Sequence, residues 1–135
     1  MLGTWLCAQE AAAYRISALF QKEDVLTTFV TNTIRSARFG AADPTGVANI
    51  IVYNYLLETK AITWNPSGRY SIDYDRTWSA LETLGAEILR IQAHGDIEAA
   101  RAFIGKYGVA GLESLSDKRV LERAGIPVDI RFAYE

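Results

Sequence analysis

Apolar residues recur along most of the chain at intervals of three or four, which is the period of an α-helix. The interval from 45 to 58 is apolar on almost every side, as is typical of a helix that is buried in a larger structure. The pattern predicts a mainly α-helical single domain over residues 1–135, with about six helices. These predicted helices cover residues 2–20, 25–37, 45–58, 75–94, 97–107 and 116–124.

Two short stretches depart from the helical period. Residues 61–64 and 69–72 are rich in β-branched and aromatic side chains, and they flank the turn sequence Asn-Pro-Ser-Gly. This arrangement predicts one small β-hairpin, which has to lean on the helices because two short strands are not stable alone. Residues 127–135 begin with proline and then alternate apolar and polar positions, so an extended C-terminal tail is expected.

Helix boundaries are marked by capping residues. Asp43 followed by Pro44 is a strong start signal, and Asp75 is the expected N-cap of the helix over 75–94. Gly95 suits the left-handed position that ends a helix, and Asp96 suits the N-cap of the next one. The sequence Ala-His-Gly-Asp therefore predicts a tight, antiparallel and well-packed helical hairpin.

Composition narrows the class of protein. Half of the residues are hydrophobic, 22% are charged and the formal net charge is −2, so a sizeable core is expected and a nucleic-acid surface is not. A single cysteine excludes a disulfide within the chain. No apolar run approaches the roughly 20 residues that span a bilayer, and the N-terminus lacks the basic region of a signal peptide. We expect a cytoplasmic protein that does not bind membranes.

Candidate catalytic groups are few. His94 is the only histidine and Cys7 the only cysteine, and neither has the sequence neighbours of a metal site or a nucleophile. Arg35 and Arg38 are three residues apart on a predicted helix and could face an anionic group. The alternative is that both arginines are solvated surface residues.

Three segments together resemble a known family. They read IRSARFGAADPTGVANIIVYNYLLE, ILRIQAHGDIEAARAFIGKYG and AGIPVDIRFAYE. In this order they are similar to the C-terminal part of the dipeptidyl-peptidase III family of zinc metallopeptidases, and most similar to its bacterial branch of zinc-dependent hydrolases, some fused to a Nudix module. Members have two lobes, one mostly helical and carrying zinc, and they remove dipeptides from the N-termini of short peptides.

The chain departs from the zinc chemistry of that family. The H-E-x-x-x-G-H helix and the later E-E-x-x-x-[DE] segment, which supply the zinc ligands, have no counterpart in the sequence. The resemblance implies that the chain begins inside the helix of the third ligand, and that zinc belongs to the full-length parent protein. We therefore expect no metal, no cofactor and no catalytic residue in this chain, and no activity from it alone.

The resemblance also implies substrate-facing positions. Peptidase members carry a histidine near the start of the helix over 45–58 and an arginine shortly after it. By alignment these places are Thr45 and either Val47 or Asn49. Arg35 and Arg38 complete the set of candidates. Because threonine cannot stabilise developing negative charge as a cation does, the parent is expected to be a weak or altered peptidase.

A second hypothesis comes from a different class of protein. The chain could be a stand-alone or accessory helical domain for partner binding or regulation, attached to a Nudix hydrolase that acts on nucleoside diphosphates. The expected partner is the remainder of the parent protein. If that is absent, apolar faces at Leu2, Trp5, Leu6, Ile50 and Ile51 predict a two-fold homodimer, unless residues 1–20 fold back and cover them.

Overall fold

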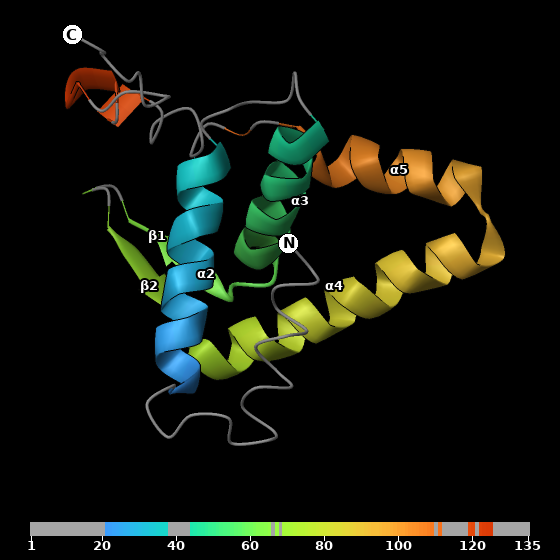
Figure 1. The fold of residues 1–135 in the computed structure, drawn as a ribbon, viewed down its shortest axis with the longest axis horizontal. Helices are drawn as coiled ribbons and strands as arrows, with labels where there is room; N and C mark the ends of the chain where they lie inside the picture. Colours follow the sequence, from blue (N-terminus) through green and yellow to red (C-terminus); the bar gives the residue numbers. More distant parts are fainter. Residues whose placement is uncertain are drawn as a thin grey trace, which may run out of the picture.

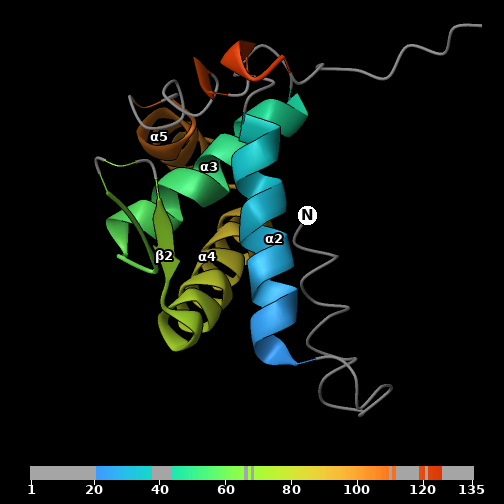
Figure 2. The same cartoon turned by 90° about the vertical axis from the view of Figure 1, so that its left-hand side faces the viewer.

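The computed structural model describes residues 21–37, 44–65, 67, 69–109, 111, 119–120 and 122–125. The described part is mainly α-helical with one small two-stranded sheet, as predicted. Figures 1 and 2 show helix α3 between α2 on one side and α5 on the other. The elements in chain order are α2 (Lys22–Ala37), α3 (Pro44–Glu58), β1 (Ile62–Trp64), β2 (Tyr70–Ile72), α4 (Tyr74–His94) and α5 (Ile97–Tyr107).

Helix α3 is the centre of the core. It contacts α2, α4, α5 and β1, which explains why its sequence is apolar on almost every side. Tyr53 and Leu56 are completely buried, and they pack with Leu26 of α2 and Leu84 of α4. The prediction that residues 45–58 form a buried helix is therefore confirmed.

Burial of α3 corrects part of the predicted dimer surface. Ile50 is completely buried inside the chain, so it cannot contribute an exposed apolar face. Ile51 is half-buried against the same core. The other residues proposed for this surface, Leu2, Trp5 and Leu6, lie outside the described residues.

The hairpin forms where the sequence predicts it, with strands of three residues each. Its register is antiparallel and pairs Ile62 with Ile72 and Trp64 with Tyr70. The side chain of Asn65 accepts hydrogen bonds from the backbone N–H groups of residues 67 and 69, at 3.1 and 3.0 Å, and thereby closes the turn. The hairpin is tied to α4 because the carbonyl of residue 61 accepts hydrogen bonds from residues 73 and 77.

The predicted N-cap of α4 is wrong by two residues. Asp73, not Asp75, has the extended backbone of a cap, and its carboxylate accepts a hydrogen bond from the N–H of Arg76 at 3.0 Å. Asp73 directly follows β2, so its extended conformation continues that of the strand. Asp75 lies in the first turn of α4, where its carboxylate pairs with Lys22 of α2 at 2.7 Å.

The caps at the corner between α4 and α5 are confirmed. Gly95 has a left-handed backbone with φ of 62°, and its N–H donates to the carbonyl of Gln92 at 3.1 Å. The next N–H, of Asp96, donates to the carbonyl of Ile91. The carboxylate of Asp96 then accepts from the N–H of Ala99 at 2.9 Å and starts α5.

The predicted close packing of this hairpin is wrong. Figure 1 shows α4 and α5 diverging from the corner, so that the C-terminal turns of α5 reach α3 instead of lying along α4. The caps determine where each helix ends, but the direction of α5 follows from its packing against α3. The position of the corner is thus determined by local sequence, whereas the direction of α5 relative to α4 is determined by its contacts with α3.

The helix count also differs from the prediction. The described residues contain four helices in place of about six. The predicted helix over 2–20 and the predicted tail over 127–135 lie outside the described residues. Of the predicted helix over 116–124, only residues 119–120 and 122–123 are described as helical. No described helix is both long and apolar enough to cross a membrane.

Two glycines allow a paired test of the corner. Gly95→Ala should lower the free energy of unfolding by about 1–2 kcal/mol, because alanine disfavours the left-handed backbone there although space is open around the added carbon. Gly105→Ala, inside α5 and equally open, should raise it by about 0.5–1 kcal/mol. Urea unfolding measures both. Equal effects in the two variants would contradict the assignment of a left-handed cap.

Candidate functional site at the two ends of helix α3

The first turns of α3 hold the positions that the family resemblance marks as substrate-facing, which are Thr45 and either Val47 or Asn49. Thr45 is exposed, Val47 is half-buried and Asn49 is 2% exposed. The amide of Asn49 donates to the carbonyl of Thr45 at 2.8 Å, so these two residues are in contact. Val47 lies on another side of the helix, where it meets Gly108 at the end of α5. Of the three, Thr45 is the residue open to solvent.

Asn49 is placed to support the helix. Its Nδ2 is fixed by the bond to Thr45, and its Oδ1 is buried without a hydrogen bond from any residue that the structure describes. A buried side chain that already bonds the backbone favours a structural role. A direct role of Asn49 toward a substrate stays a prediction.

The arginine pair is described only in part. Arg35 lies in the last turn of α2, is exposed, and donates to the side chain of Asn32 at 3.3 Å. Arg38 lies outside the described residues. Figure 1 shows that the end of α2 and the start of α3 lie at the same end of the molecule, so Arg35 and Thr45 belong to neighbouring ends of two packed helices.

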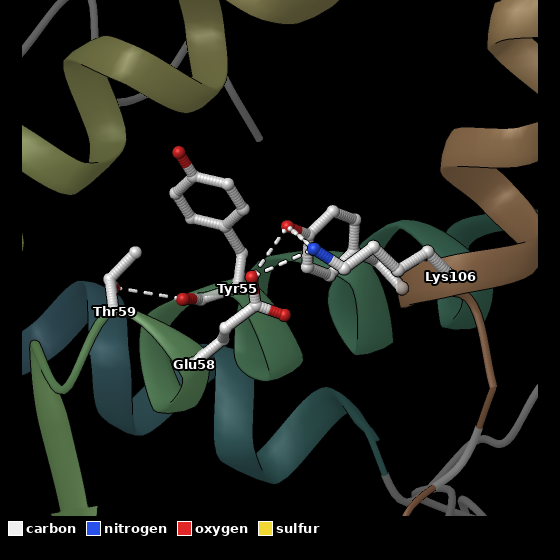
Figure 3. Close-up of polar contacts among 5 residues, drawn as sticks. Tyr55, Glu58, Thr59 and Lys106 are labelled. Atoms are coloured by element: carbon white, nitrogen blue, oxygen red, sulfur yellow. Dashed lines mark hydrogen bonds and ion pairs between the residues drawn. The ribbon is translucent and has the colours of Figure 1, made fainter.

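The other end of α3 carries a polar cluster that the sequence analysis missed. We call it the α3–α5 junction, and it consists of Asn54, Tyr55 and Glu58 of α3 with Lys106 and Tyr107 of α5. The carboxylate of Glu58 accepts from the ammonium of Lys106 at 2.8 Å and from the hydroxyl of Tyr107 at 3.1 Å (Figure 3). Lys106 also donates to the Tyr107 hydroxyl at 2.8 Å, which closes a three-membered ring of contacts.

The side chain of Asn54, which belongs to α3, caps the C-terminal end of α5. Its amide donates to the carbonyls of Tyr107 and Val109, both at 2.8 Å. The last carbonyls of a helix have no partner within the helix and need an external donor. Because Gly108 does not have a left-handed backbone, this side chain from α3 takes part of the role that a C-terminal glycine cap has elsewhere.

Aromatic packing lies beneath the polar contacts. The ring of Tyr107 is 5.3 Å from that of Tyr55 and 5.0 Å from that of Phe103, measured between centroids. Tyr107 is only 8% exposed. The ammonium of Lys106 lies 4.5 Å from the centre of the Tyr107 ring, an attractive arrangement of a cation and an aromatic face.

Electrostatics at the junction favour the charged pair. The hydrogen bond to Glu58, and then that to Tyr107, raises the pKa of Lys106 well above its ordinary value. The hydrogen bond from Lys106 lowers the pKa of Glu58, and Tyr107 adds to this. Burial, followed by the nearby Tyr107, raises the pKa of Tyr55. These groups keep one protonation state near neutral pH, so the junction is suited to holding two helices together and not to proton transfer.

The described residues do not fit a zinc site. Nowhere among them do three histidine, cysteine, aspartate or glutamate side chains gather closely enough to hold a metal ion. The single histidine of the sequence, His94, is exposed at the last turn of α4, beside the corner. No chemical step can therefore be assigned to zinc held by these residues.

The fold of this chain is also found within larger proteins of known structure. The fold is shared with dipeptidyl-peptidase III (DPP III) from Corallococcus sp. strain EGB, with a TM-score of 0.87 and 25% identity over 96% of this chain and 24% of that one. DPP III from Caldithrix abyssi is similar with a TM-score of 0.81 and 24% identity, over 89% of this chain and 23% of that one. The chain thus has a DPP III-like fold and spans about a quarter of those chains.

A curated relative gives a second connection. Nudix hydrolase 3 of Arabidopsis thaliana is 33% identical over 108 residues, which is 80% of this chain and 14% of the relative. No family model matches the sequence. The chain spans only a small part of the proteins to which it is similar.

Removal of the Asn54 side chain should weaken the attachment of α5. Asn54→Ala should lower the free energy of unfolding by about 1–2 kcal/mol, because the hydrogen bonds to the carbonyl of Tyr107, the last residue of α5, and to that of Val109 just after it are lost. Asn32→Ala, on the exposed side of α2, is the matched control and should change it by less than about 0.5 kcal/mol. Chemical denaturation followed by circular dichroism measures both. An Asn54→Ala protein as stable as the control would contradict the capping role.

The charge of Glu58 should make this attachment depend on pH. A carboxylate whose pKa is lowered by folding stabilises the fold above its ordinary pKa, near 4.5, and loses that contribution as the pH falls through the lowered value. Glu58→Gln should therefore lower the Tm at pH 7, and the difference from the unmodified protein should shrink as the pH falls below about 4.5 toward the lowered pKa of Glu58. Glu23→Gln, an exposed carboxylate in the first turn of α2, is the control and should change the Tm less, because among the described residues this charge interacts only with the dipole of its own helix. A Tm difference that stays constant between pH 7 and pH 3 would refute the role of the Glu58 charge.

Proposed function

We propose that this chain is the C-terminal helical portion of a DPP III-like zinc-dependent hydrolase and is not catalytic alone. The carrying observation is the match to the Corallococcus DPP III structure, which includes 96% of this chain but only 24% of that one. Because the fold of this chain matches about a quarter of an enzyme chain, it supports a role for this chain as one wall of the helical lobe. In this proposal zinc is held elsewhere in the parent protein, because the sequence lacks the H-E-x-x-x-G-H and E-E-x-x-x-[DE] segments that supply the zinc ligands in the resembled family.

In this proposal α3 is the functional element and the rest is its support. The core around Tyr53 and Leu56 fixes the axis of α3, and the α3–α5 junction fixes its C-terminal end. The first turn is then held in place with Thr45 open to solvent. Thr45 is the residue through which this segment contacts a substrate, with Arg35 at the neighbouring end of α2 and Val47 on another side of α3. Threonine in place of a cationic side chain makes the parent a weak or altered peptidase.

A second candidate function has its own support. The 33% identity to Nudix hydrolase 3 of Arabidopsis favours an accessory helical domain in a Nudix-associated protein. In that case the hydrolysed substrate is a nucleoside diphosphate, and this region takes part in partner binding or regulation. The coding sequence upstream of Met1 separates the two: an in-frame H-E-x-x-x-G-H favours the peptidase-like parent, and a Nudix module favours the accessory domain.

Partners and location follow from the same proposal. The principal partner is the remainder of the parent polypeptide, and the location is cytoplasmic. Neither nucleic acid nor a membrane is included among the proposed partners, and the formal net charge of −2 supports this choice for nucleic acid.

The metal content of the isolated chain tests the primary proposal. Residues 1–135, purified without a histidine tag, should hold less than stoichiometric zinc and should release no dipeptides from short peptides, because one histidine with carboxylates is a poor zinc site. Elemental analysis after dialysis gives the zinc content, and a dipeptide-release assay with added zinc gives the activity. One tightly held zinc per chain, or dipeptide release that follows the protein through purification, would disprove the proposal.

A further inference from the structure

We propose that Asn49 is a positioning residue for Thr45, and that the chain keeps this asparagine at a cost in stability. The proposal rests on the proposed function, because Thr45 is the residue assigned there to the substrate. Asn49 does not touch the substrate itself. It acts through the turn that carries Thr45, since its Nδ2 donates to the carbonyl of Thr45 at 2.8 Å.

Buried polar side chains gather where α2 ends and α3 begins. Among the described residues four serine, threonine or asparagine side chains are buried, and three of these lie at this end. They are Thr33 and Ser36 in the last two turns of α2 and Asn49 in the second turn of α3. The opposite end of the same two helices is apolar, with Leu26 and Leu56 completely buried. Because polar groups are costly to bury, this end of the core is less favourable for stability than the other.

The hydrogen bond from the Asn49 side chain adds little to the helix itself. In an α-helix the carbonyl of residue 45 already accepts from the backbone N–H of residue 49. The side chain is therefore a second donor to one carbonyl oxygen, which has two lone pairs. Asparagine is also a poorer helix former than alanine, because its side chain competes for backbone hydrogen bonds. The gain in helix stability from Asn49 is thus small.

The other half of the amide group lowers stability. Oδ1 of Asn49 is buried, and no residue that the structure describes donates a hydrogen bond to it. A buried acceptor without a donor carries the full cost of losing its water. Thr33 is also buried, but its hydroxyl donates to the carbonyl of Phe29 at 2.9 Å. An apolar side chain at position 49 should therefore give a fold at least as stable as the one with asparagine.

The position of Asn49 gives a reason for keeping it. Residues that lower stability are concentrated at functional sites, where function and stability place different demands on one position. Asn49 lies one turn after the exposed Thr45 and on the same side of α3. The first turn of a helix opens more easily than its middle, because fewer hydrogen bonds close it. A second donor on the Thr45 carbonyl restricts this opening and thereby fixes the direction of the Thr45 side chain.

The test measures global stability and local opening in the same proteins. Asn49→Ala should leave the Tm of the 135-residue chain unchanged or raise it by about 2–5 °C, because the buried acceptor is removed. Amide hydrogen exchange at residues 48 and 49 should become about three to ten times faster relative to that of Tyr53, which is the effect of one lost hydrogen bond. Asn49→Leu, which refills the volume of the asparagine, is a second variant with the same expected results.

Thr77→Val is the matched control. Thr77 of α4 is the fourth buried polar residue, and its hydroxyl donates to the carbonyl of Ala61 at 3.1 Å. Because this bond ties α4 to the hairpin, valine should lower the Tm by about 3 °C and leave the exchange ratio in α3 unchanged. In the longer parent protein, Asn49→Ala should slow dipeptide release from a short peptide by about tenfold or more, and Thr77→Val should not.

Three results would overturn the proposal. A Tm lowered by about 3 °C or more in both Asn49 variants would show that Asn49 only stabilises the fold. An unchanged exchange ratio would show that its side chain does not hold the turn. A parent protein that releases dipeptides equally fast with Asn49→Ala would show that the turn does not matter for the reaction. A parent protein that releases no dipeptides contradicts the proposed function instead, and the Tm and exchange measurements then decide the role of Asn49.

Discussion

Burial of α3 on nearly all sides is the constraint on which the rest of the structure depends. A helix with so little polar surface is unfavourable in water, so other elements have to cover each of its sides. Most of this cover comes from helices α2 and α4 and from the hairpin. The completely buried residues Tyr53 and Leu56 lie at the centre of the resulting core. The remaining side is covered by α5, whose direction is therefore set by α3 and not by the corner that connects it to α4.

The attachment of α5 combines aromatic burial with polar contacts. Tyr107 provides the buried surface, while Asn54 and the Glu58–Lys106 pair determine the register between the two helices. The exposed ion pair contributes only a small part of the stability, since surface salt bridges are largely screened by water, and the loss of Tm in Glu58→Gln should be correspondingly small. The amide of Asn54 contributes in another way, because it donates hydrogen bonds to carbonyls at and just after the end of α5 that would otherwise need donors from water. The orientation of α5 on α3 and the burial of apolar surface between them thus come from different side chains of the α3–α5 junction.

The two ends of α3 have different consequences for function. The C-terminal end is closed by contacts with α5, whereas the N-terminal turn keeps Thr45 open. A rigid helix with one open end is suited to presenting a side chain to a site built largely by other parts of a protein. This agrees with the likeness of the chain to about a quarter of the DPP III chains, in which the same fold is one part of a longer polypeptide.

The sequence alone determined the four described helices, apart from the exact start of α4, together with the hairpin and the corner, because these depend on residues close together in the chain. The helical period and the capping preferences of Gly95 and Asp96 act over only a few residues. Tertiary structure decided the angle of α5 and the α3–α5 junction. Asn54 and Glu58 lie about fifty residues before the groups that they contact, such as Lys106. No local period encodes such a pairing, since it arises only when the buried faces of α3 and α5 come together.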